Sequence, residues 1–211
     1  MRRLTTLATT LITGLALALT LAACQKAATT AVTAEDMSMG NAKAPVTMVE
    51  YTSVSCPHCA DWNKEVFPAF KAKYIDTGKV RYVLREALTS DPAIAAAGFL
   101  TARCAGKDKY FQVVDAIYRA QQEMFTGGQP HAVLLRIARS AGLTDAQFEA
   151  CIKDETALNA LNTRWEHYVK DDHINATPTF VINGKTYDKG GTTLADMDGA
   201  IAEAMAGAKS S

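Results

Sequence analysis

Hydrophobic and polar residues alternate with different spacings along this chain, and each spacing predicts a type of secondary structure. Residues 46–51 form an apolar run typical of a strand, whereas the apolar positions over residues 57–76 recur with helical spacing. Residues 79–84 alternate between apolar and polar side chains, as in a second strand. The pattern therefore predicts a strand, a helix that Pro68 should kink, and another strand.

A predominantly helical block follows, from Asp91 to about Asp172. Asp91 and Pro92 are typical of an N-cap and a first-turn proline, and Thr144 and Gln147 have the spacing of a capping box. These signals divide the block into five predicted helices, over residues 93–105, 110–125, 132–140, a segment that begins at Thr144, and 156–170.

Strand spacing returns near the end of the chain. Residues 179–182 are apolar, Asn183-Gly184 is a strong signal of a two-residue hairpin turn, and residues 185–187 form the returning strand. A last helix is predicted over residues 192–205. The element order therefore predicts an α/β domain that is interrupted by an α-helical insertion.

The first residues of the chain have the pattern of an export signal. A short basic start, Met1-Arg2-Arg3, precedes an uncharged apolar run over residues 4–21. The run ends in Leu21-Ala22-Ala23-Cys24, which resembles the lipobox of bacterial lipoproteins, where the cysteine is lipidated. We therefore expect residues 1–23 to be a signal peptide and Cys24 to carry a lipid.

Two alternatives to a lipidated terminus are open. One is an ordinary signal peptide cleaved after Ala22 or Ala23, and the other is a retained transmembrane anchor, which the small-residue cleavage site disfavours. After Cys24 the chain is rich in Ala and Thr up to about Met39. Residues 24–44 are therefore expected to form a lipidated tether that attaches the folded domain to a membrane.

Charge and length narrow the classes of function. The chain carries 22 Lys and Arg against 22 Asp and Glu, and no basic cluster occurs, so nucleic acid is not an expected partner. Without residues 1–23 the chain retains about 188 of its 211 residues, which is enough for one well-packed domain with an insertion.

The two thiols of Cys56-Pro57-His58-Cys59 lie where the first predicted strand ends and the helix begins. Unpaired N–H groups and the helix dipole favour a negative charge at the first sulfur. The arrangement predicts a thiol–disulfide exchange centre, in which Cys56 is exposed and ionised and Cys59 closes the ring. A lone C-x-x-C pair is alternatively half of a zinc site, but no second ligand pair accompanies the other cysteines.

One further pair of cysteines remains. With Cys24 lipidated and with Cys56 and Cys59 in the redox centre, Cys104 and Cys151 are left. Both lie in predicted helices of the inserted block, and disulfides persist in exported proteins. We therefore expect a structural disulfide between them rather than two free thiols.

Together these features resemble the DsbA-like family of thioredoxin-fold thiol–disulfide oxidoreductases over about residues 45–206. The motifs that carry the resemblance are Cys56-Pro57-His58-Cys59, Thr177-Pro178, the helical insertion between strands, and the strand–hairpin–helix ending. The pair Cys104 and Cys151 resembles an extra disulfide of alphaproteobacterial members, here in a lipoprotein form.

The resemblance implies a thioredoxin-like fold with an inserted α-helical domain. Residues 45–90 and 173–207 would form the thioredoxin-like domain, and residues 91–172 the helical insertion. The resemblance also implies a monomeric enzyme that needs no cofactor and no metal ion. As a membrane-anchored lipoprotein it would be located in the periplasm, at either the inner or the outer membrane.

The resemblance also assigns roles to individual residues. Cys56 matches the nucleophile, Cys59 the buried resolving cysteine, and His58 the histidine that stabilises the thiolate. Glu50 matches a buried acid that serves proton transfer, although a carboxylate in a strand can also point at solvent.

Pro57, Thr177 and Pro178 match substrate-binding positions of the family. A cis-proline at Pro178 would face the cysteines, and backbone groups of Thr177 would pair with a strand of the substrate. An ordinary trans proline at the start of a strand is the alternative.

The implied activity is the insertion of disulfides into reduced or unfolded exported proteins, followed by reoxidation through a quinone-linked membrane protein. Thr177 departs from the best-known oxidant of the family, which has valine before its cis-proline, and resembles the isomerases and reductases of the superfamily. An isomerase or reductase served by a membrane thiol reductase is therefore an alternative. A second alternative is a non-catalytic lipoprotein that binds copper or zinc through Cys56, Cys59 and His58.

Overall fold

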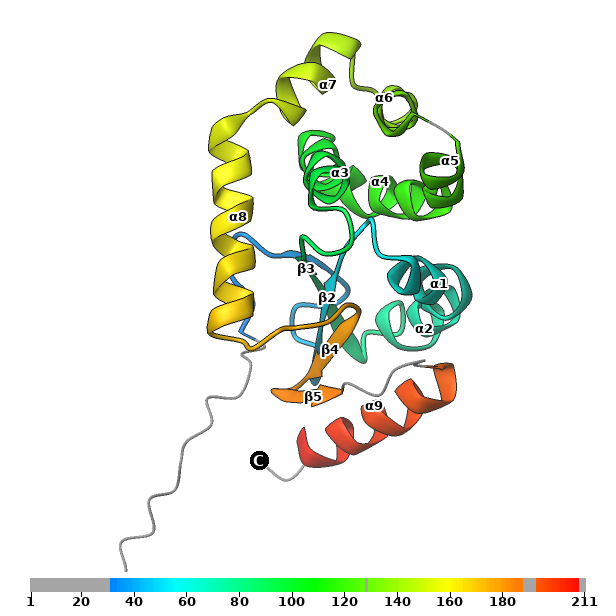
Figure 1. Ribbon diagram of the computed structural model, residues 1–211. Coiled ribbons are helices and arrows are strands. Elements are labelled where there is room, and N and C mark those ends of the chain that lie inside the picture. Colours follow the sequence, from blue (N-terminus) through cyan, green and yellow to red (C-terminus); the bar gives the residue numbers. More distant parts are fainter. Residues whose placement is uncertain (1–30, 128, 188–192, 209–211) are drawn as a thin grey trace, which may run out of the picture.

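The computed structural model describes residues 31–127, 129–187 and 193–208 (Figure 1). The predicted signal peptide, residues 1–23, and the predicted lipidation site, Cys24, lie outside these residues. In the described part of the chain, no helix has the length and apolar composition that crossing a membrane requires.

The described strands form one mixed sheet at the centre of the molecule (Figure 1). They are β1 (Met37–Met39), β2 (Val46–Thr52), β3 (Val80–Glu86), β4 (Thr179–Ile182) and β5 (Lys185–Tyr187). Their order across the sheet is β1-β3-β2-β4-β5. β2 and β3 are parallel, and the other neighbouring pairs are antiparallel. Because β2 lies between β3 and β4, it is paired along both edges.

Because successive residues of a strand point to opposite faces, β2 contributes to two cores. One core contains Val49 and Tyr51 and is covered by α8 (Glu155–Lys170), which contributes Tyr168. The larger core contains Met48 and extends among the helices on the other face. Burial on both faces explains why the sequence of β2 is an almost continuous apolar run.

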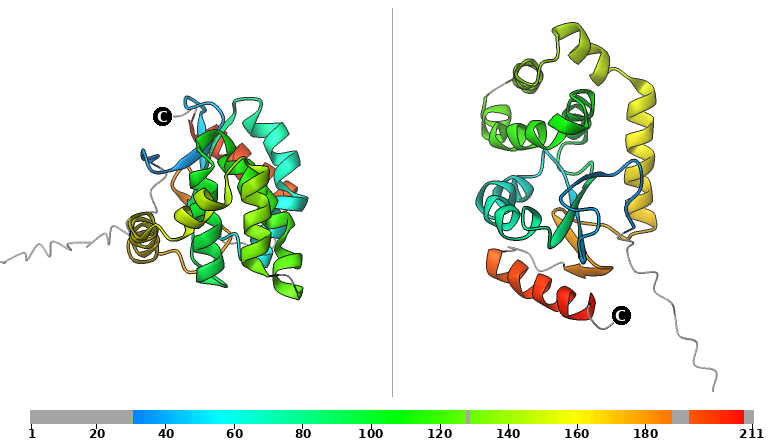
Figure 2. Two further views of the ribbon diagram at one scale, coloured as in Figure 1. Left: turned by 90° about the horizontal axis from the view of Figure 1, so that it is seen from above. Right: turned by 180° about the vertical axis from the view of Figure 1, so that it is seen from behind.

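The helices surround this sheet and extend beyond one end of it. α1, α2 and a short π-helical segment, η1, connect β2 with β3, whereas α3 to α8 connect β3 with β4, and α9 follows β5. α8 lies on the opposite side of the sheet from α1 and α2, and α3 to α7 stack above the sheet (Figures 1 and 2). The remaining bounds are α1 (Pro57–Glu65), α2 (Phe67–Phe70), η1 (Lys71–Ile75), α3 (Pro92–Cys104), α4 (Lys107–Arg119), α5 (Gln121–Thr126), α6 (Pro130–Ser140), α7 (Asp145–Ile152) and α9 (Leu194–Ala208).

Both predicted N-caps are present in the inserted block, one at the start of α3 and one at the start of α7. Asp91 Oδ1 accepts a hydrogen bond from the N–H of Ile94 at 3.0 Å, at the beginning of α3. Thr144 and Gln147 make both hydrogen bonds of a capping box at the beginning of α7. The predicted interruption of an α/β domain by a helical block is therefore confirmed.

A disulfide joins Cys104, at the end of α3, to Cys151 in α7, with an S–S distance of 1.98 Å. The two residues are 47 positions apart in the sequence. The bond therefore links the first helix of the insertion to a later one and closes a long loop of the chain.

The prediction that residues 24–44 form a tether is wrong for residues 37–39. These residues form β1, which pairs antiparallel with β3, and the side chain of Met37 is buried. Without β1, the outer edge of β3 would present unpaired backbone groups. A short strand that covers this edge and buries one apolar side chain satisfies those groups.

Two predicted helices are each divided. Residues 57–76 form α1, α2 and η1, with a first break at Val66, because Pro68 has no N–H to continue the helical ladder. Residues 110–125 are divided at Ala120, where ψ is 0°, between the end of α4 and the start of α5. No Gly or Pro occupies this second break, so the sequence pattern gave no signal of it.

Candidate active site

Cys56 ends the loop after β2 and caps the N-terminus of α1. Its φ of −82° and ψ of 122° are extended, as is usual for an N-cap, and Pro57 occupies the first helical position. The Cys56 carbonyl accepts the first hydrogen bond of the helix from the N–H of Ala60, at 3.1 Å. Cys59 follows within the first turn, so both sulfurs belong to the start of the helix.

The two cysteines are free thiols, and both are buried. Cys59 is 0% exposed, and Cys56 is 4% exposed. The prediction that Cys56 is exposed is therefore wrong for this structure. The reason is the loop that contains Thr177, whose carbonyl accepts a hydrogen bond from the Cys56 thiol at 3.4 Å.

The two thiols have opposite pKa shifts. Hydrogen bonds from the Cys59 thiol, from the Thr177 hydroxyl and from the N–H groups of Cys59 and His58 hold the pKa of Cys56 well below its usual value, although burial opposes this effect. Burial, together with the hydrogen bond to Cys56 and the charge on it, raises the pKa of Cys59. In the reduced pair, Cys56 is therefore the thiolate and Cys59 the protonated thiol.

Pro57 and His58 are both exposed at the entrance to the sulfur pair. The group of His58 that stabilises the Cys56 thiolate is its backbone N–H. Their exposure contrasts with Cys59, which is fully buried.

Glu50 points into the core, and the alternative of a solvent-facing carboxylate is wrong. The residue is 2% exposed, and the Tyr82 hydroxyl donates a hydrogen bond to its Oε2 at 2.5 Å. Burial raises the pKa of Glu50 to about 7, while hydrogen bonds from Tyr82 and Thr52 oppose this shift. A buried carboxyl that titrates near neutral pH is able to take up and release a proton during a reaction.

The peptide bond between Thr177 and Pro178 is cis, so the alternative of a trans proline is wrong. This bond lies in the loop between α8 and β4, beside Cys56. The Thr177 carbonyl contacts the Cys56 thiol, and the Thr177 hydroxyl lies 2.7 Å from the hydroxyl of Thr89. The loop therefore brings both backbone and side-chain groups to the sulfur.

Two polar residues near Cys56, Gln121 and Ser55, carry no motif in the sequence. Gln121 of α5 is buried, and its Nε2 donates to the carbonyl oxygens of Val54 and Cys56 at 2.7 and 3.0 Å. Ser55 Oγ donates to the carbonyl of Thr89 at 2.7 Å. These residues come from separate elements, and their spacing along the chain gives no signal that could have found them.

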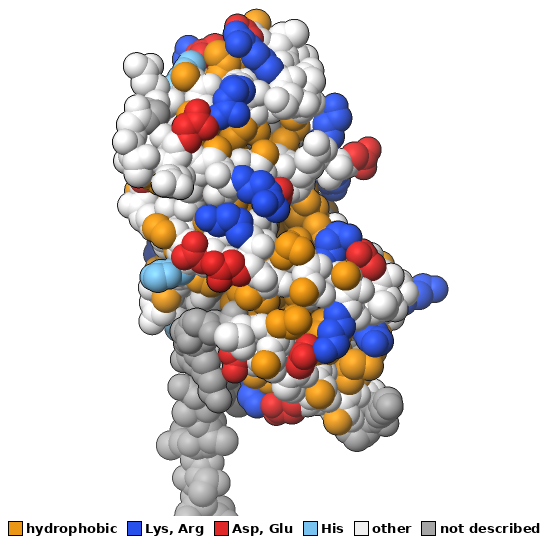
Figure 3. Space-filling model, turned by 90° about the vertical axis from the view of Figure 1, so that its right-hand side faces the viewer, with side chains coloured by type: hydrophobic (Ala, Val, Ile, Leu, Met, Phe, Trp, Pro, Cys, Tyr) orange, Lys and Arg blue, Asp and Glu red, His pale blue; other side chains and the backbone are white. Residues whose placement is uncertain are grey.

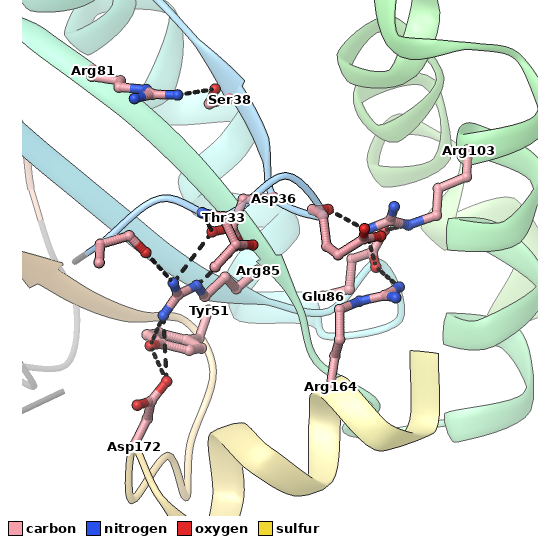
Figure 4. Close-up of polar contacts among 12 residues, drawn as sticks. Thr33, Asp36, Ser38, Tyr51, Arg81, Arg85, Glu86, Arg103, Arg164 and Asp172 are labelled. Atoms are coloured by element: carbon pink, nitrogen blue, oxygen red, sulfur yellow. Dashed lines mark hydrogen bonds and ion pairs between the residues drawn. The ribbon is translucent and has the colours of Figure 1, made fainter. Parts of the chain in front are cut away.

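Two buried ionic clusters flank the end of β3 (Figure 4). In the first, Arg85 Nη1 donates to the Tyr51 hydroxyl at 2.7 Å and to Asp172 Oδ2 at 3.3 Å, and Arg85 Nε donates to Asp36 Oδ1 at 3.2 Å. Arg85 Nη2 also donates to the carbonyl of Ala31 at 3.0 Å. This cluster holds the N-terminal segment and the end of α8 against the sheet.

The second cluster surrounds the carboxylate of Glu86, which is buried (Figure 4). It accepts hydrogen bonds from Arg103 at 2.7 and 2.8 Å, from the Tyr110 hydroxyl at 2.8 Å and from Arg164 at 2.8 Å. Because these donors come from α3, α4 and α8, one carboxylate connects the sheet to three helices of the insertion. A buried charge with this many partners is compensated in place.

Among the described residues, no three His, Cys, Asp or Glu side chains are grouped so that they could hold a metal ion. Figure 3 shows one face of the molecule, on which hydrophobic side chains gather between scattered groups of both charges. A mixed surface of this kind is compatible with contacts to other proteins.

Residues 32–203 match the sequence family described as Thioredoxin. The "Putative protein-disulfide oxidoreductase" of Rickettsia conorii is 35% identical over 152 residues, which cover 71% of this chain and 53% of that protein. The protein of the same description in Rickettsia bellii is 33% identical over 150 residues, which cover 71% of this chain and 57% of that protein. This chain therefore spans about half the length of the curated relatives it matches.

Solved structures share the architecture of this chain. The alpha-DsbA1 protein of Wolbachia pipientis has a TM-score of 0.75 at 28% identity, over 84% of this chain and 94% of that chain. The oxidised BdbD protein of Bacillus subtilis has a TM-score of 0.71 at 19% identity, over 81% of this chain and 93% of that chain, a likeness of fold alone. The predicted thioredoxin-like fold with an inserted α-helical domain is therefore confirmed.

Proposed function

Because this chain belongs to the DsbA-like family of thioredoxin-fold proteins, we propose that it is a thiol–disulfide oxidoreductase that introduces disulfides into exported proteins. The observation that carries the proposal is the opposite pKa shift of Cys56 and Cys59 at the start of α1. A stabilised thiolate stabilises the reduced enzyme, so the disulfide form becomes a strong oxidant.

The proposed reaction begins with a disulfide between Cys56 and Cys59. A substrate thiolate attacks the sulfur of Cys56, a bond forms between the two, and Cys59 leaves with the electron pair of the broken disulfide. A second thiolate of the substrate then attacks the first substrate sulfur, and Cys56 leaves as a thiolate. The substrate gains a disulfide and loses two electrons, which the reduced Cys56 and Cys59 retain.

We assign Glu50 to the proton that this exchange requires. The raised pKa of Cys59 means that its leaving sulfur takes up a proton, and Glu50 is a buried acid whose pKa is about 7. The charges of Glu50 and Cys59 interact, which supports their coupling. Reoxidation would return the proton along the same route.

The cis-proline loop is the proposed substrate-binding element. Thr177 and Pro178 lie beside Cys56, where backbone groups of the loop can pair with an extended segment of a reduced protein. Pro57 and His58 are exposed at the same entrance and would contact the substrate as well. We propose that His58 adds to the stabilisation of the Cys56 thiolate.

The proposed setting is the periplasm, with Cys24 lipidated after removal of residues 1–23. The tether would extend as far as the segment that Arg85 holds at Ala31 and Asp36. A monomer anchored in this way would be reoxidised by a quinone-linked membrane protein. Residues 91–172 are proposed as the helical insertion in the domain formed by residues 45–90 and 173–207.

A disulfide isomerase or reductase of the same fold is the second candidate, and Thr177 favours it. Such an enzyme works with Cys56 and Cys59 reduced and depends on a membrane thiol reductase. A copper- or zinc-binding lipoprotein is a weaker candidate, because the side chain of His58 is exposed whereas Cys59 is fully buried.

The resting redox state of Cys56 and Cys59 in cells separates the two redox candidates. Rapid acid quenching, followed by alkylation of free thiols and gel electrophoresis, reports this state. An oxidase is expected to be mainly oxidised, and it should oxidise a reduced unfolded protein faster than it rearranges a protein with scrambled disulfides. A pair that is reduced in cells, with the opposite order of rates, would establish the isomerase or reductase instead.

A further inference from the structure

Two threonine hydroxyls meet between the loop after β3 and the cis-proline loop. The Oγ1 atoms of Thr89 and Thr177 are 2.7 Å apart, and either can donate the hydrogen bond. The Thr177 carbonyl accepts from the Cys56 thiol at 3.4 Å, and the Thr177 hydroxyl is a hydrogen-bond donor to the Cys56 thiolate, so the residue that carries one of these hydroxyls contacts the reactive sulfur. Both threonines are half-buried.

The direction of the hydrogen bond between Thr89 and Thr177 depends on the ionisation of Cys56. A hydroxyl has one hydrogen to donate. When Cys56 is a thiolate and the Thr177 hydroxyl donates to it, the Thr177 oxygen can accept from Thr89 but has no hydrogen left for Thr89. If Thr177 donated to Thr89 instead, its hydrogen would be turned away from the sulfur.

We propose that Thr89 is a positioning residue for the reactive sulfur, because its hydroxyl donates to Thr177 and thereby turns the Thr177 hydrogen toward Cys56. The inference rests on the proposed function of Cys56 as the nucleophile. Thr89 acts through Thr177 and not by its own contact with the sulfur. It extends the site beyond the cysteine motif and the cis-proline loop to the loop that follows β3.

The backbone around Thr89 is held in place by the loop that precedes Cys56. The carbonyl of Thr89 accepts hydrogen bonds from Ser55 Oγ at 2.7 Å and from Ser53 Oγ at 3.1 Å. The N–H of Asp91 donates to Ser55 Oγ at 3.2 Å. Because these contacts involve the main chain of Thr89, a change of its side chain alone should leave the loop in position.

Other titratable groups also act on Cys56. Cys59 faces it from α1, Glu50 interacts with it from β2, and Tyr118 from α4, while His58 contributes its backbone N–H. None of these groups is altered by a substitution of Thr89. A change in the ionisation of Cys56 in a Thr89 variant is therefore attributable to the hydroxyl pair if the fold is retained.

The test is the pKa of Cys56 in the reduced full-length protein, followed by thiolate absorbance against pH. Thr89→Val removes the hydroxyl and keeps the shape of the side chain, and it should lower the acid-ionisation constant of Cys56 about threefold. Thr89→Ser should restore the wild-type value. Thr101→Val is the control, because it also removes a threonine hydroxyl, here a fully buried one that donates to the carbonyl of Ala97 within α3.

A double-variant cycle then shows whether Thr89 acts through Thr177. In a Thr177→Val background, the further change Thr89→Val should have no effect on the pKa of Cys56. An unchanged pKa in Thr89→Val, or the same threefold effect with Thr177 absent, would overturn the proposal. The measurement needs no substrate, so it can succeed or fail whether the enzyme proves to be an oxidase or an isomerase.

The redox potential provides an independent readout of the same proposal. Titration against glutathione buffers should show that Thr89→Val is less oxidising than the wild type, because a less stable thiolate makes the reduced form less stable. A merely structural role of Thr89 would lower the unfolding free energy and leave the potential unchanged. That result would also overturn the proposal.

Discussion

Tyr82 donates a 2.5 Å hydrogen bond to Glu50, and this pair links β3 to β2 inside the core. Both side chains are buried, so the carboxyl has little access to water. Burial raises the pKa of Glu50 from its ordinary value of 4.5 to about 7. The stability of the fold must therefore depend on whether Glu50 carries its proton.

We expect Glu50 to make the protein less stable as the pH rises from 4.5 to about 7. Over this range the folded protein keeps the Glu50 proton and the unfolded chain has lost it, so the stabilisation is fully present below pH 4.5 and is lost above about pH 7. Glu50→Gln removes this titration. Urea unfolding at a series of pH values should show wild type losing about 3 kcal/mol relative to Glu50→Gln across the window.

Glu65→Gln is the matched control for this experiment, because Glu65 is exposed in α1. Its unfolding free energy should follow the wild-type pH course. If Glu50→Gln also followed that course, Glu50 would not be the buried acid that the structure indicates, and its proposed part in proton transfer would lose its basis.

Gln121 couples the helical insertion to the active-site loop, since its side chain donates to the carbonyl oxygens of Val54 and Cys56. Gln121→Leu retains most of the volume and removes both donors. Two carbonyl oxygens would lose a partner, and we expect a loss of about 1–3 kcal/mol of unfolding free energy. The loop would also hold Cys56 less firmly, so the rate of substrate oxidation should fall.

Gln122→Leu provides the comparison, because Gln122 is the exposed neighbour on α5. Urea unfolding and the rate of oxidation of a reduced peptide should be close to those of wild type. Equal behaviour of the Gln121 and Gln122 variants would show that the two hydrogen bonds to the loop contribute neither to stability nor to the reaction.

Local signals in the sequence are sufficient for the hairpin and for the start of α1. Asn183 and Gly184 have positive φ values of 46° and 84°, which these residue types adopt with little strain, so the turn between β4 and β5 was predictable. Pro57 likewise fixes the first helical position after Cys56. Each of these features is decided within a few residues of the chain.

Contacts between distant segments were not predictable in this way. β1 is only three residues long, and its strand conformation depends on the edge of β3, which is decided more than 40 residues later in the chain. Gln121 and Thr89 reach the site from a helix and a loop without any motif. The coverage of Cys56 likewise depends on where the Thr177 loop packs, which no spacing around the cysteines encodes.

Gly98 of α3 leaves room for the loop before the cysteine pair. A Cβ atom at this position would lie 2.7 Å from Cγ2 of Val54 and 3.3 Å from Cδ1 of Ile117. Gly98→Ala should therefore push Val54 aside and cost about 1–3 kcal/mol of unfolding free energy despite the better helix propensity of alanine. Combining it with Val54→Ala should recover part of this loss, which urea unfolding can measure.

Gly199 of α9 is the matched comparison, because a Cβ atom there would meet nothing within 4 Å. Gly199→Ala should stabilise the protein by up to about 1 kcal/mol through helix propensity alone. If both alanine variants were equally stabilised, the packing of α3 against Val54 would be looser than the structure indicates.

The disulfide between Cys104 and Cys151 should stabilise the fold without acting on the redox centre. It closes a loop of 47 residues, so the paired change Cys104→Ala and Cys151→Ala should lower the unfolding free energy by about 4 kcal/mol in the chain-entropy description. The bond connects α3 to α7, whereas Cys56 ionises through contacts with Cys59 and the Thr177 loop. Urea unfolding should therefore show the loss while the pKa of Cys56 stays at its wild-type value. A shifted pKa in a folded variant would mean that the insertion transmits strain to the site, and an unchanged unfolding free energy would mean that packing alone fixes the two helices.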